Sequence, residues 1–265
     1  MMSERTSYEL GTPSWVDLGT PDMDASVAFY SALFGWDVPE SENAEQTGGY
    51  RQATKNGKPV AGMMPLMQEG QPPAWSTYVS VTDADATAAA VGEAGGSVIA
   101  EPMDVMDLGR MAIFADPTGA VFGIWQPGTF IGAGLVNEHG AFSWNELGTR
   151  DTAAAKQFYS AVFGWQPADN DMGEMGTYTE WKRGEEGSAG GMMDVSGRLP
   201  DEIPAHWLTY FAVEDADAAV ETVKEKGGSV SFGPIDIPVG RFAIVQDPHG
   251  AAFAVIKLSA DAGRR

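Results

Sequence analysis

The sequence has no cysteine and few histidines. The absence of cysteine excludes disulfides, thiolate metal clusters and a cysteine nucleophile, and three histidines in 265 residues leave little for a histidine metal site. No stretch approaches the run of about 18 apolar residues that crosses a membrane, and the first five residues lack the apolar segment of a signal peptide. We therefore expect a cytoplasmic protein with no membrane partner.

Basic residues are also scarce. Lys and Arg total 16 against 37 Asp and Glu, which gives a formal net charge of -21. This field repels the phosphates of nucleic acids, so we expect no nucleic-acid partner. The acidic surface either serves solubility alone or also attracts a cationic ligand.

The chain contains two long repeats. Residues 15–20 (WVDLGT) recur 129 positions later as residues 144–149 (WNELGT), and the FYSA and FGW motifs of residues 29–36 recur at the same shift. Gly-Arg and Asp-Pro-x-Gly motifs close both halves. A duplication of this kind predicts two similar domains, at 12–128 and 141–258, joined by a linker at 129–140 and flanked by tails at 1–11 and 259–265.

A weaker repeat divides each half into two modules. In each module an Asp precedes an apolar-periodic segment of about a dozen residues that ends at a Gly, a pattern typical of a capped helix. A short strand-like run precedes each helix, at 15–18, 77–81, 144–147 and 208–213, and further strand-like pieces separated by turn motifs follow it. Each of the four modules therefore has the predicted order strand, helix, strand, strand, strand.

The motifs FYSALFGW and DPTGAVFGIWQP, with DPHGAAFAVIK in the second half, resemble those of the vicinal oxygen chelate superfamily. This superfamily includes glyoxalase I, extradiol dioxygenases, and bleomycin and fosfomycin resistance proteins. The two-copy arrangement looks like an actinobacterial subgroup labelled glyoxalase-like or hydroxylase. The resemblance implies an α+β fold of tandem glyoxalase-like domains, with four βαβββ modules forming curved mixed sheets around two cavities.

The resemblance also bears on metal binding. Metal enzymes of the superfamily take ligands, usually His or Glu, from the first and last strand of each module. The matching positions hold neither, being Trp15, Ser76, Trp144 and Leu208 on first strands and Gly62, Gly123, Gly191 and Ala254 on last strands. We therefore expect no metal and no other cofactor.

Residues two apart in a strand share a face, so these positions also predict a cavity lining. The predicted ligand-binding residues are Trp15, Asp17, Met64, Tyr78, Trp125, Trp144, Glu146, Met193, His206 and Tyr210, together with Arg110 and Arg241 from the repeated Gly-Arg. An acid in an apolar strand is costly unless paired. Asp17 and Glu146 therefore either form structural ion pairs with Arg110 and Arg241 or act on a ligand. The two tryptophans of the first strands either line the cavities or belong to the core.

Three functions fit this lining. The first is a metal-independent small-molecule binding protein that sequesters or presents a planar natural product, as drug-sequestering antibiotic resistance proteins do; the acids would allow a cationic one. The second is a metal-free lyase, isomerase or hydroxylase-like enzyme with Asp17 or Glu146 as general base. The third is an interaction protein with vestigial pockets. The sequence leaves open whether modules pair within or across halves, and whether the chain is a monomeric pseudodimer or a homodimer.

Overall fold

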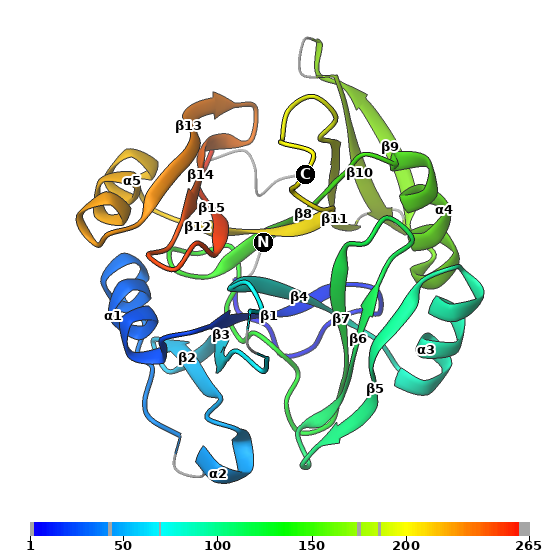
Figure 1. Ribbon diagram of the computed structural model, residues 1–265, viewed down its shortest axis with the longest axis horizontal. Helices are drawn as coiled ribbons and strands as arrows, with labels where there is room; N and C mark the ends of the chain where they lie inside the picture. The colour runs from blue at the N-terminus through cyan, green and yellow to red at the C-terminus, as the bar shows by residue number, and fades with distance from the viewer. Residues whose placement is uncertain (1–2, 42–43, 69, 174–175, 185–186, 260–265) are drawn as a thin grey trace.

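The computed structural model describes residues 3–41, 44–68, 70–173, 176–184 and 187–259 (Figure 1). The first half contains, in chain order, β1 (Pro13–Thr20), α1 (Met23–Phe34), α2 (Ala44–Thr47), β2 (Arg51–Lys55), β3 (Lys58–Pro65), β4 (Ala74–Ser80), α3 (Ala84–Glu93), β5 (Ser97–Val105), β6 (Gly109–Ala115) and β7 (Val121–Pro127). The second half contains β8 (Phe142–Thr149), α4 (Thr152–Phe163), β9 (Gln166–Asp171), β10 (Thr177–Arg183), β11 (Gly187–Asp194), β12 (His206–Ala212), α5 (Ala216–Glu225), β13 (Ser229–Ile237), β14 (Gly240–Gln246) and β15 (Ala252–Leu258).

The four long helices begin and end where the sequence predicts. Asp22 and Asp151 accept hydrogen bonds from the free N–H groups of Ala25 and Ala154 in the first turns of α1 and α4. Gly35 and Gly164 end these helices in the left-handed conformation, with φ of 68° and 69°. The predicted α+β fold is confirmed.

Each half forms one curved mixed sheet. The first has the strand order β2-β3-β1-β4-β7-β6-β5, and the second has the order β13-β14-β15-β12-β8-β11-β10-β9. The first strands of the two modules pair antiparallel, β1 with β4 and β8 with β12. The modules therefore pair within each half, and the alternative of pairing across the halves is excluded.

The first module departs from the predicted order. Among the described residues it has two strands after its long helix, β2 and β3, whereas the third module has β9, β10 and β11. An isolated bridge between Asp37 and Thr54 takes the place of the missing strand.

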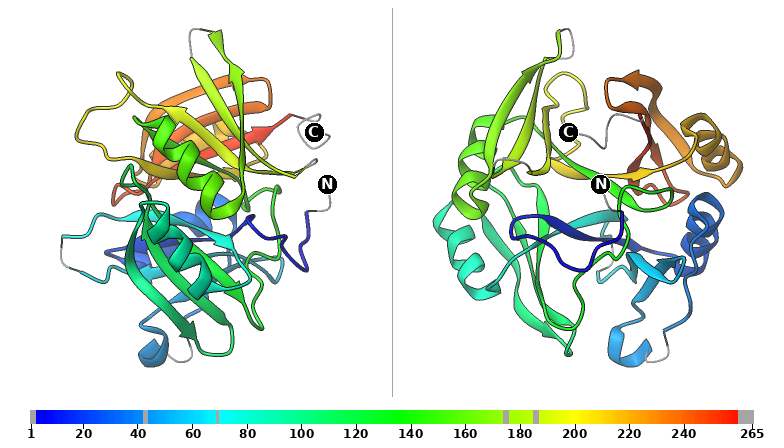
Figure 2. Two further views of the ribbon diagram at one scale, coloured as in Figure 1. Left: turned by 90° about the vertical axis from the view of Figure 1, so that its right-hand side faces the viewer. Right: turned by 180° about the vertical axis from the view of Figure 1, so that it is seen from behind.

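The two halves pack with the helix-bearing faces of their sheets toward each other. Figures 1 and 2 show α1 beside α5 at one side and α3 beside α4 at the other. Between the sheets, Thr77 Oγ1 on β4 donates a hydrogen bond to Asn145 Oδ1 on β8 at 2.8 Å. Each curved sheet also has an opposite face, which turns away from the other half. We call this face inner face 1 in the first half and inner face 2 in the second half.

Two buried tyrosines fasten the halves together. Tyr30 on α1 donates to Asp247 Oδ2 at 3.1 Å, and Tyr159 on α4 donates to Asp116 Oδ2 at 3.0 Å. Both aspartates belong to the Asp-Pro-x-Gly turns, so each turn receives a helix tyrosine from the other half. Within the described ranges, no helix is long and apolar enough to span a membrane.

Candidate functional site

The strand registers confirm which side chains share each inner face. Trp15 lies opposite Tyr78, and Asp17 lies opposite Ser76 on one side and Gly62 on the other. In the second half Trp144 lies opposite Tyr210, and Glu146 lies opposite both Leu208 and Gly191. The faces predicted from strand alternation are therefore correct.

On inner face 1 these residues form a hydrogen-bonded cluster with Tyr50. Trp15 Nε1 donates to the Tyr50 hydroxyl at 2.7 Å. Asp17 accepts hydrogen bonds from the hydroxyls of Tyr78, Tyr50 and Ser76. Trp15, Asp17 and Tyr78 are only 4%, 4% and 5% exposed, so side chains fill the centre of this face where the sequence predicts a cavity.

Inner face 2 repeats the cluster with glutamate in place of aspartate. Trp144 Nε1 donates to the Tyr178 hydroxyl at 2.8 Å, and the Tyr210 hydroxyl donates to Glu146 Oε1 at 3.1 Å. Tyr178 also hydrogen-bonds Glu146. Unlike their counterparts, Trp144 and Glu146 are half-buried and reach the surface.

Glycines make room for these phenols. A Cβ at Gly62 would lie 1.8 Å from the Tyr50 hydroxyl oxygen, and one at Gly191 would lie 1.9 Å from that of Tyr178. At Gly123 it would lie 2.3 Å from the Tyr78 ring. At these three positions, where the resemblance would place metal ligands, a tyrosine therefore lies directly against a glycine backbone.

Both acids bind their proton more tightly than usual. Burial raises the pKa of Asp17 to about 7, against the hydrogen bonds from Tyr78, Tyr50 and Ser76, which lower it. Burial also raises the pKa of Glu146, and hydrogen bonds from Tyr178 and Tyr210 oppose that rise. The pKa of the Tyr50 phenol is raised well above 10, by burial and then by the charge of Asp17. The clusters therefore hold neutral phenols around a carboxyl group whose protonated form is favoured by burial, and for Asp17 that form is populated near neutral pH.

This donor set does not fit a divalent metal. Each cluster has one carboxyl group and protonated phenols, whereas a catalytic metal site usually supplies at least three nitrogen, oxygen or sulfur ligands. Within the described part of the chain, no three His, Cys, Asp or Glu side chains lie close enough together to hold an ion.

The two arginines lie elsewhere. Arg110 binds Asp85 at 3.1 Å and approaches Asp104 at 3.5 Å, and Arg241 binds Asp217 through two nitrogens at 2.9 Å each. The alternative in which Asp17 pairs with Arg110 and Glu146 with Arg241 is therefore wrong, and neither arginine lies on the inner face where the sequence predicts it. Arg110 on β6 does lie near an acid, but that acid is the exposed Asp85 in the first turn of α3, not Asp17.

The remaining predicted residues surround the clusters. Met64 and Met193 lie one inner-facing position beyond Gly62 and Gly191. His206, the first residue of β12, lies opposite Gly148, and its Nδ1 is hydrogen-bonded to the Pro204 carbonyl at 2.9 Å. Trp125 is 7% exposed and donates through Nε1 to the Phe130 carbonyl at 2.8 Å.

Tyr50 and Tyr178 are functional candidates that strand alternation does not predict. They occupy equivalent places, Tyr50 just before β2 and Tyr178 near the start of β10. A sequence signal exists, because both follow a glycine two residues earlier, Gly48 and Gly176, at a repeat shift of 128. Their role depends on how the preceding loop reaches the sheet, which strand periodicity does not specify.

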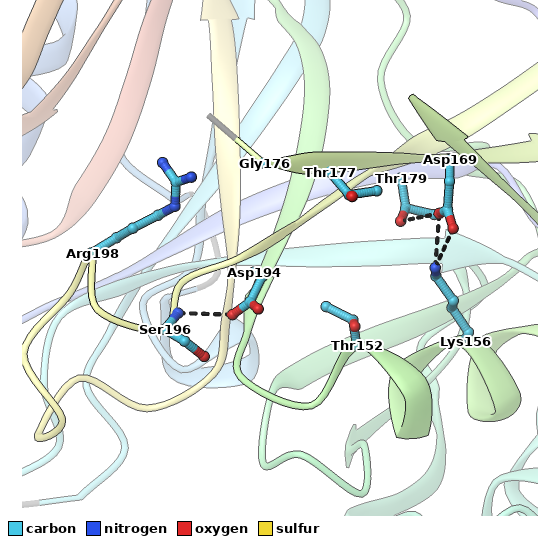
Figure 3. Close-up of a pocket in the computed structure, with 9 residues that line it drawn as sticks. All are labelled: Thr152, Lys156, Asp169, Gly176, Thr177, Thr179, Asp194, Ser196 and Arg198. Atoms are coloured by element: carbon cyan, nitrogen blue, oxygen red, sulfur yellow. Dashed lines mark hydrogen bonds and ion pairs between the residues drawn. The ribbon is translucent and has the colours of Figure 1, made fainter. Parts of the chain in front are cut away.

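A polar cleft of about 320 Å³ lies on the other side of β10 (Figure 3). It is lined by Thr152, Lys156, Asp169, Gly176, Thr177, Thr179, Asp194, Ser196 and Arg198. Thr177 and Thr179 flank Tyr178 in the strand and therefore point away from inner face 2. Lys156 binds Asp169 at 2.7 Å, so the charges in this cleft compensate one another, and the cleft is separate from the acid–tyrosine clusters.

Paired modules of the βαβββ kind, with one strand of the first replaced by an isolated bridge, form one curved sheet in each half, which is the architecture of a tandem glyoxalase-like protein. Comparison with known families agrees: residues 12–124 and 141–255 match the model of the Glyoxalase/Bleomycin resistance protein/Dioxygenase superfamily. The chain belongs to this superfamily.

Several relatives match nearly the whole chain. The Mycobacterium tuberculosis (strain CDC 1551 / Oshkosh) protein named "Putative glyoxylase CFP32" is 43% identical over 260 residues, covering 97% of this chain and 98% of the relative. The "Anthracycline biosynthesis protein DnrV" of Streptomyces peucetius is 40% identical over 268 residues, covering 96% and 95%.

Solved structures share the fold at low sequence identity. A Mn(II)-bound glyoxalase from Novosphingobium aromaticivorans matches with a TM-score of 0.65 and 17% identity, over 94% of this chain and 82% of that chain. The 2,3-dioxygenase LapB from Pseudomonas sp. KL28 matches with a TM-score of 0.65 and 15% identity, over 94% and 93%. At such identities the likeness concerns the fold alone.

Proposed function

We propose that this protein is a metal-independent small-molecule binding protein whose inner face 2 takes a planar, largely apolar molecule carrying a carbonyl or hydroxyl oxygen. The observation that carries the proposal is the half-buried Trp144–Glu146 pair within an apolar wall. That wall consists of Leu208, Tyr210, Ile237, Phe242, Ile244, Ala252, Ala254, Ile256 and Leu258. A protein that sequesters or presents such a molecule needs only to bind it, without a catalytic step.

The apolar wall suits a flat ring system. Tyr210 and Phe242 lie with ring centroids 5.9 Å apart, and Phe232, which is 47% exposed, extends the aromatic surface from Phe242 at another 5.9 Å. Burying about 200 Å² of ligand surface is worth about 5 kcal/mol gross, and stacking on an indole such as that of Trp144 adds about 1 kcal/mol.

The raised pKa of Glu146 favours a neutral ligand over a cation. A protonated carboxyl both donates and accepts hydrogen bonds, so it pairs with a carbonyl or hydroxyl oxygen without leaving a buried charge. The name of the DnrV relative supports this chemistry, because anthracyclines are fused-ring quinones with such oxygens.

The same pKa shifts favour a second candidate, a metal-free acid–base enzyme of the lyase, isomerase or hydroxylase-like kind. A pKa of about 7, as for Asp17, suits proton transfer at neutral pH. The phenols of Tyr178 and Tyr210, rather than an arginine, would then stabilise a developing oxyanion near Glu146.

Titration with 1,4-dihydroxyanthraquinone, followed by tryptophan fluorescence, tests the binding function. We expect saturable quenching, and affinity at least about tenfold weaker in Trp144→Ala, which corresponds to 1.4 kcal/mol. Arg241→Ala, remote from inner face 2, is the matched control and should bind as the wild type does. A cationic amino-substituted anthraquinone should bind no tighter than the neutral compound; no saturable quenching by any compound of a broad planar panel would refute the proposal.

Glu146→Gln separates the two candidates. Glutamine keeps a neutral donor and acceptor, so a binding protein should retain affinity within about threefold, a change below 1 kcal/mol. An acid–base catalyst should instead convert a compound of the panel during incubation, detected by mass spectrometry, and lose that conversion in Glu146→Gln while still binding.

A further inference from the structure

The segment that follows β7 crosses inner face 1. Figure 1 shows it in green between β7 and β3. Phe130 N donates to the Leu108 carbonyl at 3.0 Å, Ala133 N to the Ser14 carbonyl at 2.8 Å, and Gly134 N to the Pro59 carbonyl at 2.8 Å. These bonds fix residues 128–134 to the β5–β6 turn, to β1 and to β3 in succession. We call this segment the strap.

The strap places an aromatic ring on the cluster of inner face 1. The rings of Phe130 and Trp15 meet edge to face, with centroids 4.9 Å apart and planes at 88°. Phe130 also meets Trp125 at 5.9 Å, and its carbonyl accepts the Trp125 Nε1 hydrogen bond. The backbone and ring of Phe130 are thus both held, and Trp15 is almost fully covered.

The equivalent ring position on inner face 2 differs. In the part of the chain that the structure describes, no aromatic ring meets Trp144 edge to face as Phe130 meets Trp15, and Trp144 stays half-buried. Ile256 takes the place of Trp125, and the position that the repeat aligns with Phe130, Asp261, lies outside the described residues. The clusters beneath are alike, since in each an indole N–H donates a hydrogen bond to a phenol that lies beside an acid.

We infer that inner face 1 is a second binding site for a planar aromatic ring, and that Phe130 of the strap occupies it. The inference rests on the proposed function, because it takes inner face 2 as the site that binds ligand in the native chain. It also assigns the ligand's position there: one aromatic ring lies against Trp144, as Phe130 lies against Trp15. The ligand class is the same for both faces, a neutral fused-ring compound with an oxygen directed at the carboxyl group.

The strap can be loosened without removing a core side chain. Gly132 has φ of +110°, and a Cβ there would lie 2.3 Å from the Ser14 carbonyl oxygen. Gly132→Ala should therefore displace the strap from β1 and release Phe130, while leaving every inner-face side chain in place.

The test is the number of 1,4-dihydroxyanthraquinone molecules bound per chain, measured by fluorescence titration at protein concentrations above the dissociation constant. We expect one in the wild type and two in Phe130→Ala and in Gly132→Ala. Phe130→Leu, which keeps most of the side-chain volume, is the matched control and should bind one. Circular dichroism establishes that each variant is folded.

The double variant Phe130→Ala, Trp144→Ala locates the new site. It should bind one molecule at the released site of inner face 1 and a second at least about tenfold more weakly than the wild type does, whereas Trp144→Ala alone should show only the weakened binding. One molecule bound by the wild type and still one by both strap variants would overturn the inference and leave the proposed function standing. No binding by the wild type would overturn the proposed function itself.

Discussion

Replacing Asp17 with asparagine tests the central electrostatic feature of inner face 1. The pKa of Asp17 rises on folding from 3.8 to about 7 because the carboxyl group is buried. Between these values the folded chain holds a proton that the unfolded chain has released, so stability falls as pH rises, and the loss is complete above the folded pKa. A shift of about three units corresponds to about 4 kcal/mol in total, of which about 2 to 3 kcal/mol develops between pH 5 and pH 8.

Urea unfolding at pH 5 and at pH 8 measures this loss. The wild-type free energy of unfolding should fall more between the two pH values than that of Asp17→Asn, by about 2 to 3 kcal/mol, because asparagine does not ionise. Glu101→Gln, at an exposed position on β5, is the control and should follow the wild type. Parallel curves for the wild type and Asp17→Asn would refute the reasoning, since they would mean that folding does not change the proton affinity of Asp17.

Two further substitutions test other contacts. Gly191→Ala places a Cβ on the Tyr178 hydroxyl, so we expect Tyr178 to leave its bonds and quinone affinity to fall at least about tenfold in the fluorescence titration; unchanged affinity would show that the phenol does not shape the site. Tyr159→Phe leaves the buried Asp116 without its donor from the other half, so urea unfolding should show a loss of about 1 to 3 kcal/mol; a loss below about 0.5 kcal/mol, the scale of surface substitutions, would exclude a role in fastening the halves.

The fold was predictable because its determinants are local and repeated. An Asp at the start of each long helix, a Gly after its end and an Asp-Pro-x-Gly turn before the last strand of each half act within a few residues, and each recurs. Strand alternation likewise placed Trp15, Asp17 and Tyr78 on one face, since the strand period is two.

The missed features depend on contacts between distant segments. The sequence has 37 acids, so the repeated Gly-Arg motif did not reveal which of them Arg110 would meet; it meets Asp85 at the start of α3. The strap has no periodicity, and its anchors at Ser14 and Pro59 lie more than 70 residues away in the chain. The sequence alone therefore assigns Phe130 to the linker at 129–140.

The exchange of tyrosines between the halves makes each half complementary to itself. The first half carries Tyr30 and Asp116, and the second carries Tyr159 and Asp247, so either half holds both a donor and an acceptor of the kind its neighbour needs. Such a surface can pair with a second copy of itself about a two-fold axis. The tandem chain is the covalent form of that arrangement, in which a short connection replaces dependence on protein concentration and lets the two inner faces differ in sequence.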